Sequence, residues 1–361
     1  MKILLLSTER GWHGGEEQLR LLVEAAQAAG HECRVAARAG GQFARRMCEA
    51  GVAVDELAGN VRGPRAAWRV RRILRWFRPQ VVHANDPHGL SLMNLACWGL
   101  PRAGQGGPLR IAARRTLFPI RSTSKYRRCD RVVCVSRAIA QICRESGLPE
   151  SLLAVVHDGV DPTRMESGDR ERGRAALELA AQQPLVLCVA QLAAYKGHRY
   201  LIDAWSTVRR HHPAAVLALA GDGPLRTGLA QQVEALRLGD TVRLLGYRND
   251  VPDLVQACDL FVLASPEEGL GTSVLDAMFA ERAVVGADAG GIPEMLRDDD
   301  GVESGWLAAP RDADSLAACL CSALADPAER QRRAAAGRER AWAAFTADTM
   351  AQRTLQLFSA G

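Results

Sequence analysis

The chain has 361 residues, 48% of them hydrophobic and 24% charged, which is the composition of a soluble globular protein with two or three domains. No apolar run reaches the roughly 20 residues of a membrane span, and the short apolar start predicts a first strand rather than a secretory signal. The ten cysteines are scattered without a C-x-x-C motif, which favours reduced thiols and a cytoplasmic protein.

The charge is divided unevenly along the chain, although the net charge is only +5. Residues 1–165 contain 26 Lys and Arg against 14 Asp and Glu, whereas residues 166–361 contain 20 against 27. A basic half and an acidic half indicate two domains with different partners. The basic half should attract the phosphate groups of lipids, nucleic acids or small molecules.

Short β-type runs alternate with helical patterns along the whole chain. In the first half, strands are predicted at 2–8, 32–38, 81–85, 110–114, 131–136 and 152–159, and a helix at 16–30. In the second half, strands are predicted at 184–190, 215–223, 242–247, 260–265, 283–288 and 305–309, and helices at 199–212, 225–239, 273–280 and 313–325. This alternation predicts an α/β fold with two doubly wound parallel sheets, whose ligands bind beyond the carboxyl ends of the strands.

The polar stretch 161–173, which contains glycine and proline, predicts the hinge between the domains. We therefore expect an N-terminal domain at 1–163 and a C-terminal domain at 164–343. The last segment predicts an amphipathic helix. The side chains that could dock it onto another domain are Phe345, Met350, Leu355 and Phe358. The residues alone equally allow this helix to complete the second domain.

The stretch 265–280, SPEEGLGTSVLDAMFA, connects a predicted strand to a predicted helix. Its glycines would let a ligand approach the backbone, and the N-terminus of the helix favours an anion such as a phosphate. A purely structural explanation is a capping box formed by Ser273 and Asp276. Capping does not explain Glu268, a carboxylate beside a site for anions, which could accept hydrogen bonds from sugar hydroxyls.

Two further turns of the second half follow strands. Lys196 and Gly197 open a helix at a point where a lysine can clamp a diphosphate, or can simply lie on the surface. Gly221 belongs to a Gly-Asp-Gly-Pro sequence, and a tight turn before a helix is sufficient to explain that sequence.

In the first half, Gly14 and Gly15 open the first helix and offer backbone N–H groups to an anion. No G-x-G-x-x-G motif is present, so a dinucleotide site is disfavoured.

A second polar group in this half ends the strand at 81–85 and consists of His83, Asn85, Asp86 and His88. We expect His83 to be a satisfied core histidine, and Asp86 and His88 to be more exposed. No set of His or Cys residues has metal-ligand spacing, and neither D-x-D sequence directly follows a core strand, so no metal is predicted.

The helix predicted around 62–78 concentrates much of the basic charge. Trp68, Ile73, Trp76 and Phe77 are interleaved there with arginines. The pattern suits a helix that lies on anionic lipid, and equally an arginine-rich solvated face above a core stripe. No known nucleic-acid-binding module is present, so we predict no nucleic-acid partner.

Taken together, these residues resemble the retaining glycosyltransferases of family 4, which have the GT-B fold. The resemblance covers nearly the whole chain and is strongest through VVCVSRAIA, VVHDGVDP, KGH, GDGP, LLGYRNDVPDLVQACDLFVLAS and EEGLGTSVLDAMFAERAVVGADAGGIPE. Its central mark is the E-x7-E motif of the family, here Glu268 to Asp276. The resemblance implies two Rossmann-like doubly wound domains facing a deep cleft, with the C-terminal helix, 344–361, crossing back to the N-terminal domain.

The resemblance also implies a nucleotide-sugar donor held mainly by the C-terminal domain. Glu268 would contact hydroxyls of the donor sugar, Asp276 the ribose, and Lys196 the distal phosphate. The other donor-binding residues that it implies are Gly14, Gly15, Gln191, Gly221, Tyr247, Arg248, Gly269, Leu270, Gly271, Thr272 and Ser273. The residues implied near the acceptor are His13, Asp86, His88 and Arg115, and the implied catalytic set is Glu268, Lys196 and Arg115.

Three positions depart from the family pattern. The family commonly has an arginine where this chain has Gln191, so one cation for the phosphates is absent. It often has a histidine where Arg115 stands, and Arg115 would contact the donor, a neighbouring phosphate or an acidic acceptor. It usually has a glutamate where Asp276 stands, which shortens the ribose contact by one methylene group.

The expected function is a retaining, metal-independent glycosyltransferase that needs no cofactor and moves a sugar from a nucleotide-diphosphate sugar to an acceptor. The expected acceptor is a lipid-linked or oligosaccharide precursor of a lipopolysaccharide-type surface glycan. The basic N-terminal domain would contact the inner face of the plasma membrane peripherally. The alternatives are a GT-B nucleotide-sugar epimerase and a non-catalytic sugar-nucleotide-binding protein.

Overall fold

The computed structural model describes residues 1–61 and 63–359 and consists of two compact units. Unit 1 comprises Met1–Gly159 and the chain from Ala347, and unit 2 comprises Val160–Thr346. The units divide before the predicted hinge, because Met165 is already buried in the core of unit 2. Residue 62 of the predicted basic helix and residues 360–361 of the predicted final helix lie outside the described residues.

Unit 1 is built on a parallel sheet of seven strands in the order β3-β2-β1-β4-β5-β6-β7. The strands are β1 (Lys2–Ser7), β2 (Glu32–Arg38), β3 (Ala53–Leu57), β4 (Val81–Ala84), β5 (Leu109–Arg114), β6 (Arg131–Cys134) and β7 (Leu153–Val155). The sequence predicted all of them except β3. This strand lies at the sheet edge and is mostly exposed or half-buried, so it lacks the continuous apolar run of a central parallel strand.

Helices cover both faces of this sheet. They are α1 (Gly14–Ala28), α2 (Gln42–Glu49), α3 (Pro64–Phe77), α4 (Pro87–Ala96), α5 (Arg137–Glu145) and α14 (Ala347–Ser359), with the 3₁₀ turns η1 (Tyr126–Arg128) and η2 (Glu150–Leu152). Successive strand residues point to opposite faces. Ile3 and Leu5 of β1 therefore pack with α1, α2 and α14, whereas Leu4 and Leu6 pack with α3, α4 and α5.

Unit 2 is built on a parallel sheet of six strands in the order β10-β9-β8-β11-β12-β13. The strands are β8 (Leu185–Val189), β9 (Val216–Ala220), β10 (Val242–Gly246), β11 (Leu260–Leu263), β12 (Ala283–Ala287) and β13 (Trp306–Ala308). The sequence predicted all six, because buried parallel strands are short apolar runs.

The helices of unit 2 are α6 (Arg170–Ala176), α7 (His198–His211), α8 (Arg226–Ala235), α9 (Val251–Ala257), α10 (Thr272–Phe279), α11 (Ile292–Leu296), α12 (Ala313–Ala325) and α13 (Pro327–Ala344), and its 3₁₀ turns are η3 (Pro162–Met165) and η4 (Ala194–Lys196). They surround one continuous apolar core. In both units strands and helices alternate, and the strand order reverses near the middle of the sheet. Each unit is therefore a Rossmann-like doubly wound fold.

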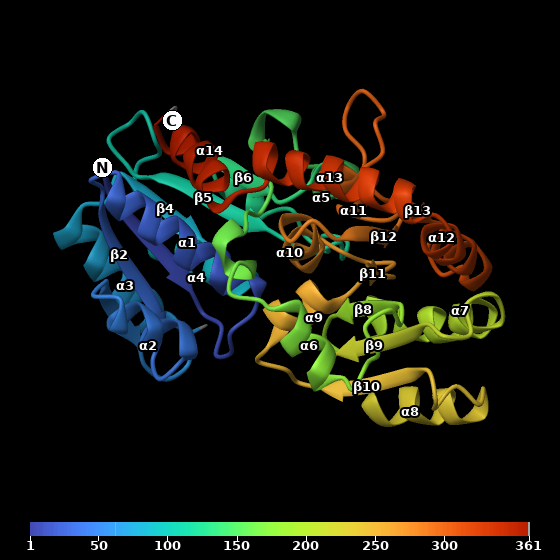
Figure 1. Cartoon of the computed structure of the whole chain (residues 1–361). Coiled ribbons are helices and arrows are strands. Elements are labelled where there is room, and N and C mark those ends of the chain that lie inside the picture. Colours follow the sequence, from blue (N-terminus) through green and yellow to red (C-terminus); the bar gives the residue numbers. More distant parts are fainter. Residues whose placement is uncertain (62, 360–361) are drawn as a thin grey trace. The chain divides into compact units, whose positions relative to one another are not determined.

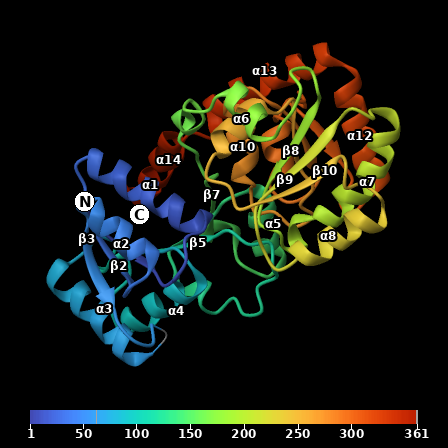
Figure 2. The ribbon, with the colours of Figure 1, turned by 60° about the horizontal axis from the view of Figure 1, so that its bottom comes forward.

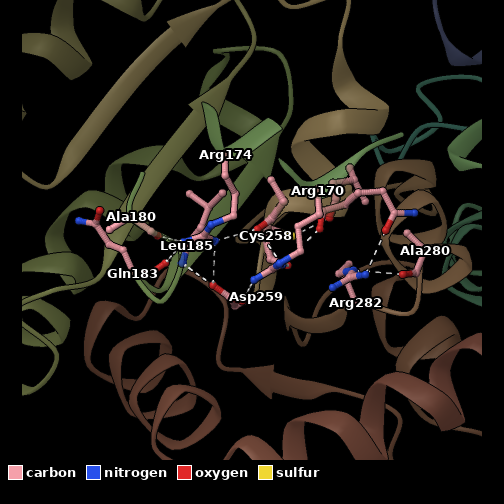
Figure 3. A network of polar contacts seen from close by, with 12 residues as sticks. Arg170, Arg174, Ala180, Gln183, Leu185, Cys258, Asp259, Ala280 and Arg282 are labelled. Carbon is pink, nitrogen blue, oxygen red and sulfur yellow. Dashed lines mark hydrogen bonds and ion pairs between the residues drawn. The ribbon is translucent and has the colours of Figure 1, made fainter. Parts of the chain in front are cut away.

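The start of the unit 2 sheet is fixed by a group of arginines around Asp259 (Figure 3). The carboxylate of Asp259 accepts hydrogen bonds from the Leu185 N–H and from the Arg170 guanidinium, each over 2.8 Å. Arg174, which is buried, donates to the carbonyl of Ala257 over 3.2 Å. These contacts tie α6 to the first residues of β8 and β11 and hold the two strands in register.

The last helix, α14, belongs to unit 1 and lies alongside α1 (Figure 1), as the family resemblance implies. It begins at Ala347 rather than at 344, because α13 ends at Ala344 and Phe345 is buried in the core of unit 2. Met350 and Phe358 are buried in unit 1 and Leu355 packs against the same core, so three of the four predicted docking side chains serve that purpose. Within the described residues, no helix combines the length and the apolarity that a membrane span requires.

Candidate active site

Lys196 and Glu268 meet where the strand order of unit 2 reverses, between β8 and β11. A doubly wound sheet presents its ligand site beyond the carboxyl ends of the strands at this reversal. Lys196 ends η4 after β8, and Glu268 lies in the loop after β11. Their side chains form an ion pair with 2.5 Å between Nζ and Oε2, and they are 17% and 13% exposed. The two residues that the sequence singled out thus form one partly shielded charge pair.

A glycine brings these two loops together. Gly197 has φ +72°, in the left-handed region that residues with a side chain rarely adopt. A Cβ atom on Gly197 would lie 2.0 Å from the carbonyl oxygen of Ala264, the residue after β11. The loop after β8 therefore packs directly on the backbone at the end of β11, which places Lys196 beside the segment that carries Glu268.

The N-terminus of α10 lacks a side-chain cap. Its N-cap residue is Gly271, at φ +98°, and among the residues that the structure describes no side-chain cap bonds to it. The predicted capping box of Ser273 and Asp276 is therefore wrong, because the helix has already begun at Thr272. The first N–H groups of a helix have no intrahelical partner, so those of Thr272 and Ser273 are available to an anion.

The loop before α10 is supported by the turn that precedes α11. The Gly291 N–H donates to the carbonyl of Glu268 over 3.1 Å, and a Cβ atom on Gly291 would lie 2.4 Å from the carbonyl oxygen of Gly269. The side chain of Leu270 is buried in the core. Gly269, which is partly exposed, can therefore face a ligand with its main chain, whereas Leu270 is buried and anchors the loop in the core.

Asp276 lies on α10, is buried, and faces a residue that the sequence did not single out. One of its carboxylate oxygens, Oδ2, is 3.7 Å from Nη1 of Arg164 in η3. Arg164 is half-exposed, so it can move without unpacking the core. It precedes Asp276 by more than a hundred residues in a polar segment, and no local pattern connects the two positions.

Gln191 and Gly221 have structural contacts in this region. The side-chain oxygen of Gln191 accepts a hydrogen bond from the Tyr195 hydroxyl over 2.9 Å, so this position supplies a polar but uncharged group. The Gly221 N–H donates to the carbonyl of Gly246 over 2.8 Å, and a Cβ atom on Gly221 would lie 2.0 Å from the carbonyl oxygen of Ala190. This close approach explains the glycine without a ligand.

Tyr247 and Arg248, two of the residues implied for donor binding, follow β10. Tyr247 is exposed. The guanidinium of Arg248 binds Asp250, with 2.7 Å between Nε and Oδ1, and holds the pKa of that carboxyl below its ordinary value. Arg248 is thus fixed by a neighbour in the free protein, whereas the ring of Tyr247 is open to solvent.

In unit 1, Arg115 is held by two side chains at the carboxyl end of the sheet. Its Nη1 donates to Oδ1 of Asn85 over 2.7 Å, and its Nε donates to Oδ1 of Asp158 over 3.3 Å. Burial raises the pKa of Asp158, and the charge of Arg115 opposes this rise. Asp158 was not among the predicted site residues, although it lies in the sequence VVHDGVDP that carries the resemblance.

Gly14 and Gly15 form the first turn of α1 and lie against the same group. The side-chain nitrogen of Asn85 donates to the Gly15 carbonyl over 3.0 Å. Glu16 is buried, and its carboxylate accepts from the His13 N–H and the Ser7 hydroxyl, both over 3.3 Å. Burial raises the pKa of Glu16, and His13 opposes the rise. Gly15 and Glu16 therefore belong to a packed polar group with Asn85 and Arg115, whereas His13 and Gly14 are exposed beside it.

Asp86 is buried and fully used by the fold, so its predicted exposure is wrong. It caps α4 by accepting from the N–H groups of His88 and Gly89, and it accepts from the N–H and the hydroxyl of Thr8. His88 is half-buried at the start of α4. His83 is a core histidine as predicted, but it is not satisfied: within the described part of the chain neither ring nitrogen has a hydrogen-bond partner.

Two family models match the chain in succession. Residues 12–164 match the model described as Glycosyltransferase Family 4, and residues 169–340 match that described as Glycosyl transferases group 1. The chain is a GT-B glycosyltransferase of group 1. These matches confirm the resemblance to this family that was inferred from the E-x7-E motif and the residues around it.

Named relatives of this glycosyltransferase act on different glycans. It is 28% identical over 311 residues to a glycogen synthase of Mycobacterium tuberculosis, covering 82% of this chain and 73% of that protein. It is 27% identical over 291 residues to the lipopolysaccharide core biosynthesis glycosyltransferase LpsE of Rhizobium meliloti, covering 81% and 79%. The crystal structure of Anabaena HepE in complex with UDP and glucose superposes with a TM-score of 0.84 over the full length of both chains at 22% identity, which confirms the fold.

The unit 2 site of this glycosyltransferase offers three kinds of group within one short stretch of surface. Lys196 supplies a cation, the N-terminus of α10 supplies backbone N–H donors, and Glu268 supplies a carboxylate. Cation and N–H donors suit an anion, and the carboxylate suits hydroxyl groups. In the described ranges, no group of three or more His, Cys, Asp or Glu side chains is arranged to hold a metal ion.

Proposed function

We propose that this glycosyltransferase takes a sugar from a nucleotide-diphosphate sugar bound by unit 2 and transfers it with retention of the anomeric configuration, without a metal. The observation that carries this proposal is the Lys196–Glu268 pair beside the uncapped N-terminus of α10, at the strand reversal of the sheet. A nucleotide-diphosphate sugar has an anion and a ring of hydroxyls joined at one bond, and this site has a complementary group for each.

Each group has a defined role in the proposed reaction. Lys196 and the N–H groups of Thr272 and Ser273 stabilise the diphosphate as negative charge builds on it, which a divalent metal would otherwise do. Glu268 accepts hydrogen bonds from hydroxyls of the donor sugar and fixes its orientation. Asp276 accepts from the ribose, and Tyr247 borders the base.

The bond between the anomeric carbon and the phosphate oxygen breaks, and the acceptor hydroxyl oxygen bonds to that carbon on the same face. The proton of this hydroxyl passes to the departing phosphate oxygen. No protein side chain needs to serve as the base, and the residues already named stabilise the anion that accepts the proton.

The proposed acceptor is a lipid-linked or lipopolysaccharide-type glycan, reached at the cytoplasmic face of the plasma membrane. Two observations support it. A relative that matches most of the chain is named as a lipopolysaccharide core biosynthesis glycosyltransferase, and the first 165 residues carry a large excess of positive charge. Positive charge draws a protein towards anionic lipid headgroups.

The donor is tested by thermal unfolding of the protein with UDP-, GDP- and ADP-sugars, because a bound ligand raises the apparent stability. The donor that stabilises most is then assayed for transfer to a membrane extract. We expect Glu268→Ala to abolish transfer, and Glu267→Ala to leave it intact. Glu267 is the adjacent glutamate, and its carboxylate pairs instead with Arg311 over 2.7 Å.

Full transfer by Glu268→Ala would refute the site. Conversion of the sugar nucleotide without an acceptor would indicate an epimerase, and stabilisation by the donor without turnover in any extract fraction would indicate a binding protein. Inversion at the anomeric carbon, or loss of activity in a chelator, would refute the proposed chemistry.

A further inference from the structure

Unit 1 exposes three tryptophan side chains on neighbouring elements. Trp68 and Trp76 of α3 are 61% and 53% exposed, and Trp98, shortly after α4, is 65% exposed. Burying an indole ring against the core is strongly favourable, so three rings left in water on one part of a surface require an explanation. We call this surface the tryptophan face, and it includes the exposed arginines Arg65, Arg72, Arg75 and Arg128.

The core packing of α3 does not account for its tryptophans. The buried side of the helix consists of Ala66, Ala67, Val70, Ile73, Leu74 and Phe77. Trp68 and Trp76 lie on the other side, on the stripe that carries the exposed arginines. The sequence pattern grouped Trp68 and Trp76 with Ile73 and Phe77, and the structure separates the two pairs.

Trp98 joins this stripe because α4 packs against α3 (Figure 2). Arg71 of α3 donates to the carbonyl of Ala96 over 2.9 Å and also to the carbonyl of Trp98, which fixes the end of α4 beside α3. Arg72 lies over the ring of Trp68 at 5.5 Å, and Arg128 lies over the ring of Trp98 at 5.0 Å. These rings are therefore presented together with guanidinium groups.

The charge at the centre of the face is positive. No aspartate or glutamate occurs between residues 57 and 85, a range that contains seven arginines. An acidic side chain comes close at the edge next to Trp76, where Arg34 stacks on the ring at 4.4 Å and is itself paired with Asp55. The centre of the face, around Trp68 and Arg72, is basic and aromatic.

We propose that the tryptophan face docks this enzyme on a bilayer that contains anionic phospholipid. Tryptophan rings favour the headgroup level of a membrane, where the ring meets hydrocarbon and the indole N–H meets water. Arginines around them are attracted to anionic headgroups. This inference rests on the proposed function, because the proposed acceptor is lipid-linked and the tryptophan face is the surface that would bring the enzyme to it.

Two other occupants are less compatible with these observations. A second copy of the chain would bring two faces of the same positive sign together, and like charges repel. A single-stranded nucleic acid could stack on the rings, but the sequence contains no known nucleic-acid-binding module. The bilayer uses both the exposed rings and the positive charge.

The experiment is co-sedimentation with vesicles of phosphatidylcholine alone and of phosphatidylcholine mixed with phosphatidylglycerol. We expect the wild-type protein to bind only the anionic vesicles, with an affinity that falls as salt rises. Trp68→Ala/Trp98→Ala and Arg72→Glu/Arg75→Glu should each weaken this binding by roughly tenfold or more. Brominated lipid should quench the tryptophan fluorescence of the wild-type protein more than that of the tryptophan variant.

The matched controls lie in unit 2. Trp342→Ala removes another exposed tryptophan, and Arg210→Glu reverses an exposed arginine on α7; both should bind vesicles as the wild type does. Circular dichroism and donor binding by each variant check that the fold is intact.

Equal binding of wild-type protein and the two face variants would overturn the proposal, and so would equal binding to neutral and anionic vesicles. Tighter binding of an RNA oligonucleotide through the same residues would replace the bilayer with nucleic acid as the occupant. The vesicles contain no sugar nucleotide and the donor-binding assay contains no lipid. Either proposal can therefore fail while the other stands.

Discussion

The Nζ atom of Lys196 lies 2.5 Å from Oε2 of Glu268, and this contact joins the ends of the two strands between which the sheet of unit 2 reverses its order. Both side chains are largely shielded from water, so salt screens the pair less than it would a surface pair. A diphosphate at the N-terminus of α10 would compete with Glu268 for Lys196. If the ammonium group of Lys196 bound the phosphate instead of Glu268, the carboxylate of Glu268 would be free to accept hydrogen bonds from sugar hydroxyls.

Removal of the charge of Lys196 should therefore weaken donor binding. We expect Lys196→Gln to raise the dissociation constant of the preferred nucleoside diphosphate about tenfold to a hundredfold, because a hydrogen bond to a charged group contributes about 1.5–3 kcal/mol. Lys196→Arg keeps the charge and should recover part of the loss. Isothermal titration calorimetry measures both variants.

The control for this prediction is Lys2→Gln, since the chain has only three lysines and Lys2 is exposed at the start of β1. It should bind the diphosphate as the wild type does. Wild-type affinity in Lys196→Gln would show that this lysine does not contact the phosphates.

Asp276 should contribute to the ribose end of the donor rather than to the phosphates. Asp276→Ala is expected to weaken binding of the nucleoside diphosphate about tenfold, the effect of one hydrogen bond to a carboxylate, and to leave inorganic pyrophosphate unaffected. Competition against the bound donor measures both ligands. Because Asp276 faces Arg164 at 3.7 Å, Arg164→Gln is the matched variant. An equal loss in Arg164→Gln would show that Asp276 acts by holding the arginine and not by binding ribose.

The sequence predicted those parts of the fold and site that depend on local patterns. Buried parallel strands are apolar runs, so all six strands of unit 2 were found, whereas β3 was missed because an edge strand carries polar residues. Lys196 and Glu268 were identified because each follows such a run. The capping box was wrong because the S-x-x-D spacing does not reveal where the helix begins. The N-cap is Gly271, in the left-handed region, two residues before Ser273.

Contacts between distant segments could not be predicted in this way. Arg115 and Asp158 are 43 residues apart, and nothing in the spacing of either residue indicates the other. Asp86 looked like an exposed site residue because its contact with Thr8 depends on which strands are neighbours; its role as the cap of α4 is local, and an Asp before a Pro indicates such a cap. Such pairings become visible only when the order of the strands is known.

The Arg115–Asp158 pair should behave as one unit in stability. Loss of the guanidinium would leave Asp158 as a buried carboxylate without its main counter-charge, and breaking a buried pair in this way costs about 3–5 kcal/mol. Because Arg115 is itself only partly buried, at 21% exposed, we expect Arg115→Gln to lower the free energy of unfolding by less than that, about 1–3 kcal/mol. Asp158→Asn in the same chain should recover most of the loss, because the buried charge is then gone. Urea denaturation of the two single variants and the double variant measures the coupling.

The pH dependence gives an independent check on this pair. Burial raises the pKa of Asp158 above the ordinary value of 3.8, so the folded state disfavours its ionised form and stability is lost as the pH rises above that value. Arg115 reduces this loss in the wild type. Arg115→Gln should therefore lose stability with rising pH more steeply than the wild type, and the double variant should not. Additive single effects with parallel pH profiles would mean that the two residues act independently.

Two buried histidines should make the protein sensitive to acid. Burial lowers the pKa of His83 to about 3 and that of His198 to about 4, against an ordinary value of 6.5. Below pH 6.5 the unfolded chain binds protons that the folded chain does not, so stability falls as the pH falls, by roughly 1.4 kcal/mol per pH unit for each histidine until its folded pKa is reached. His83 faces the ring of Phe358 at 5.9 Å, so acid should also loosen α14.

Urea unfolding at pH 7 and pH 5 measures this effect. The free energy of unfolding should differ less between the two pH values for His83→Leu than for the wild type. For His211→Gln, which alters an exposed histidine of α7, the difference should equal that of the wild type. An equal pH dependence in wild type and His83→Leu would contradict the burial of a neutral imidazole at this position.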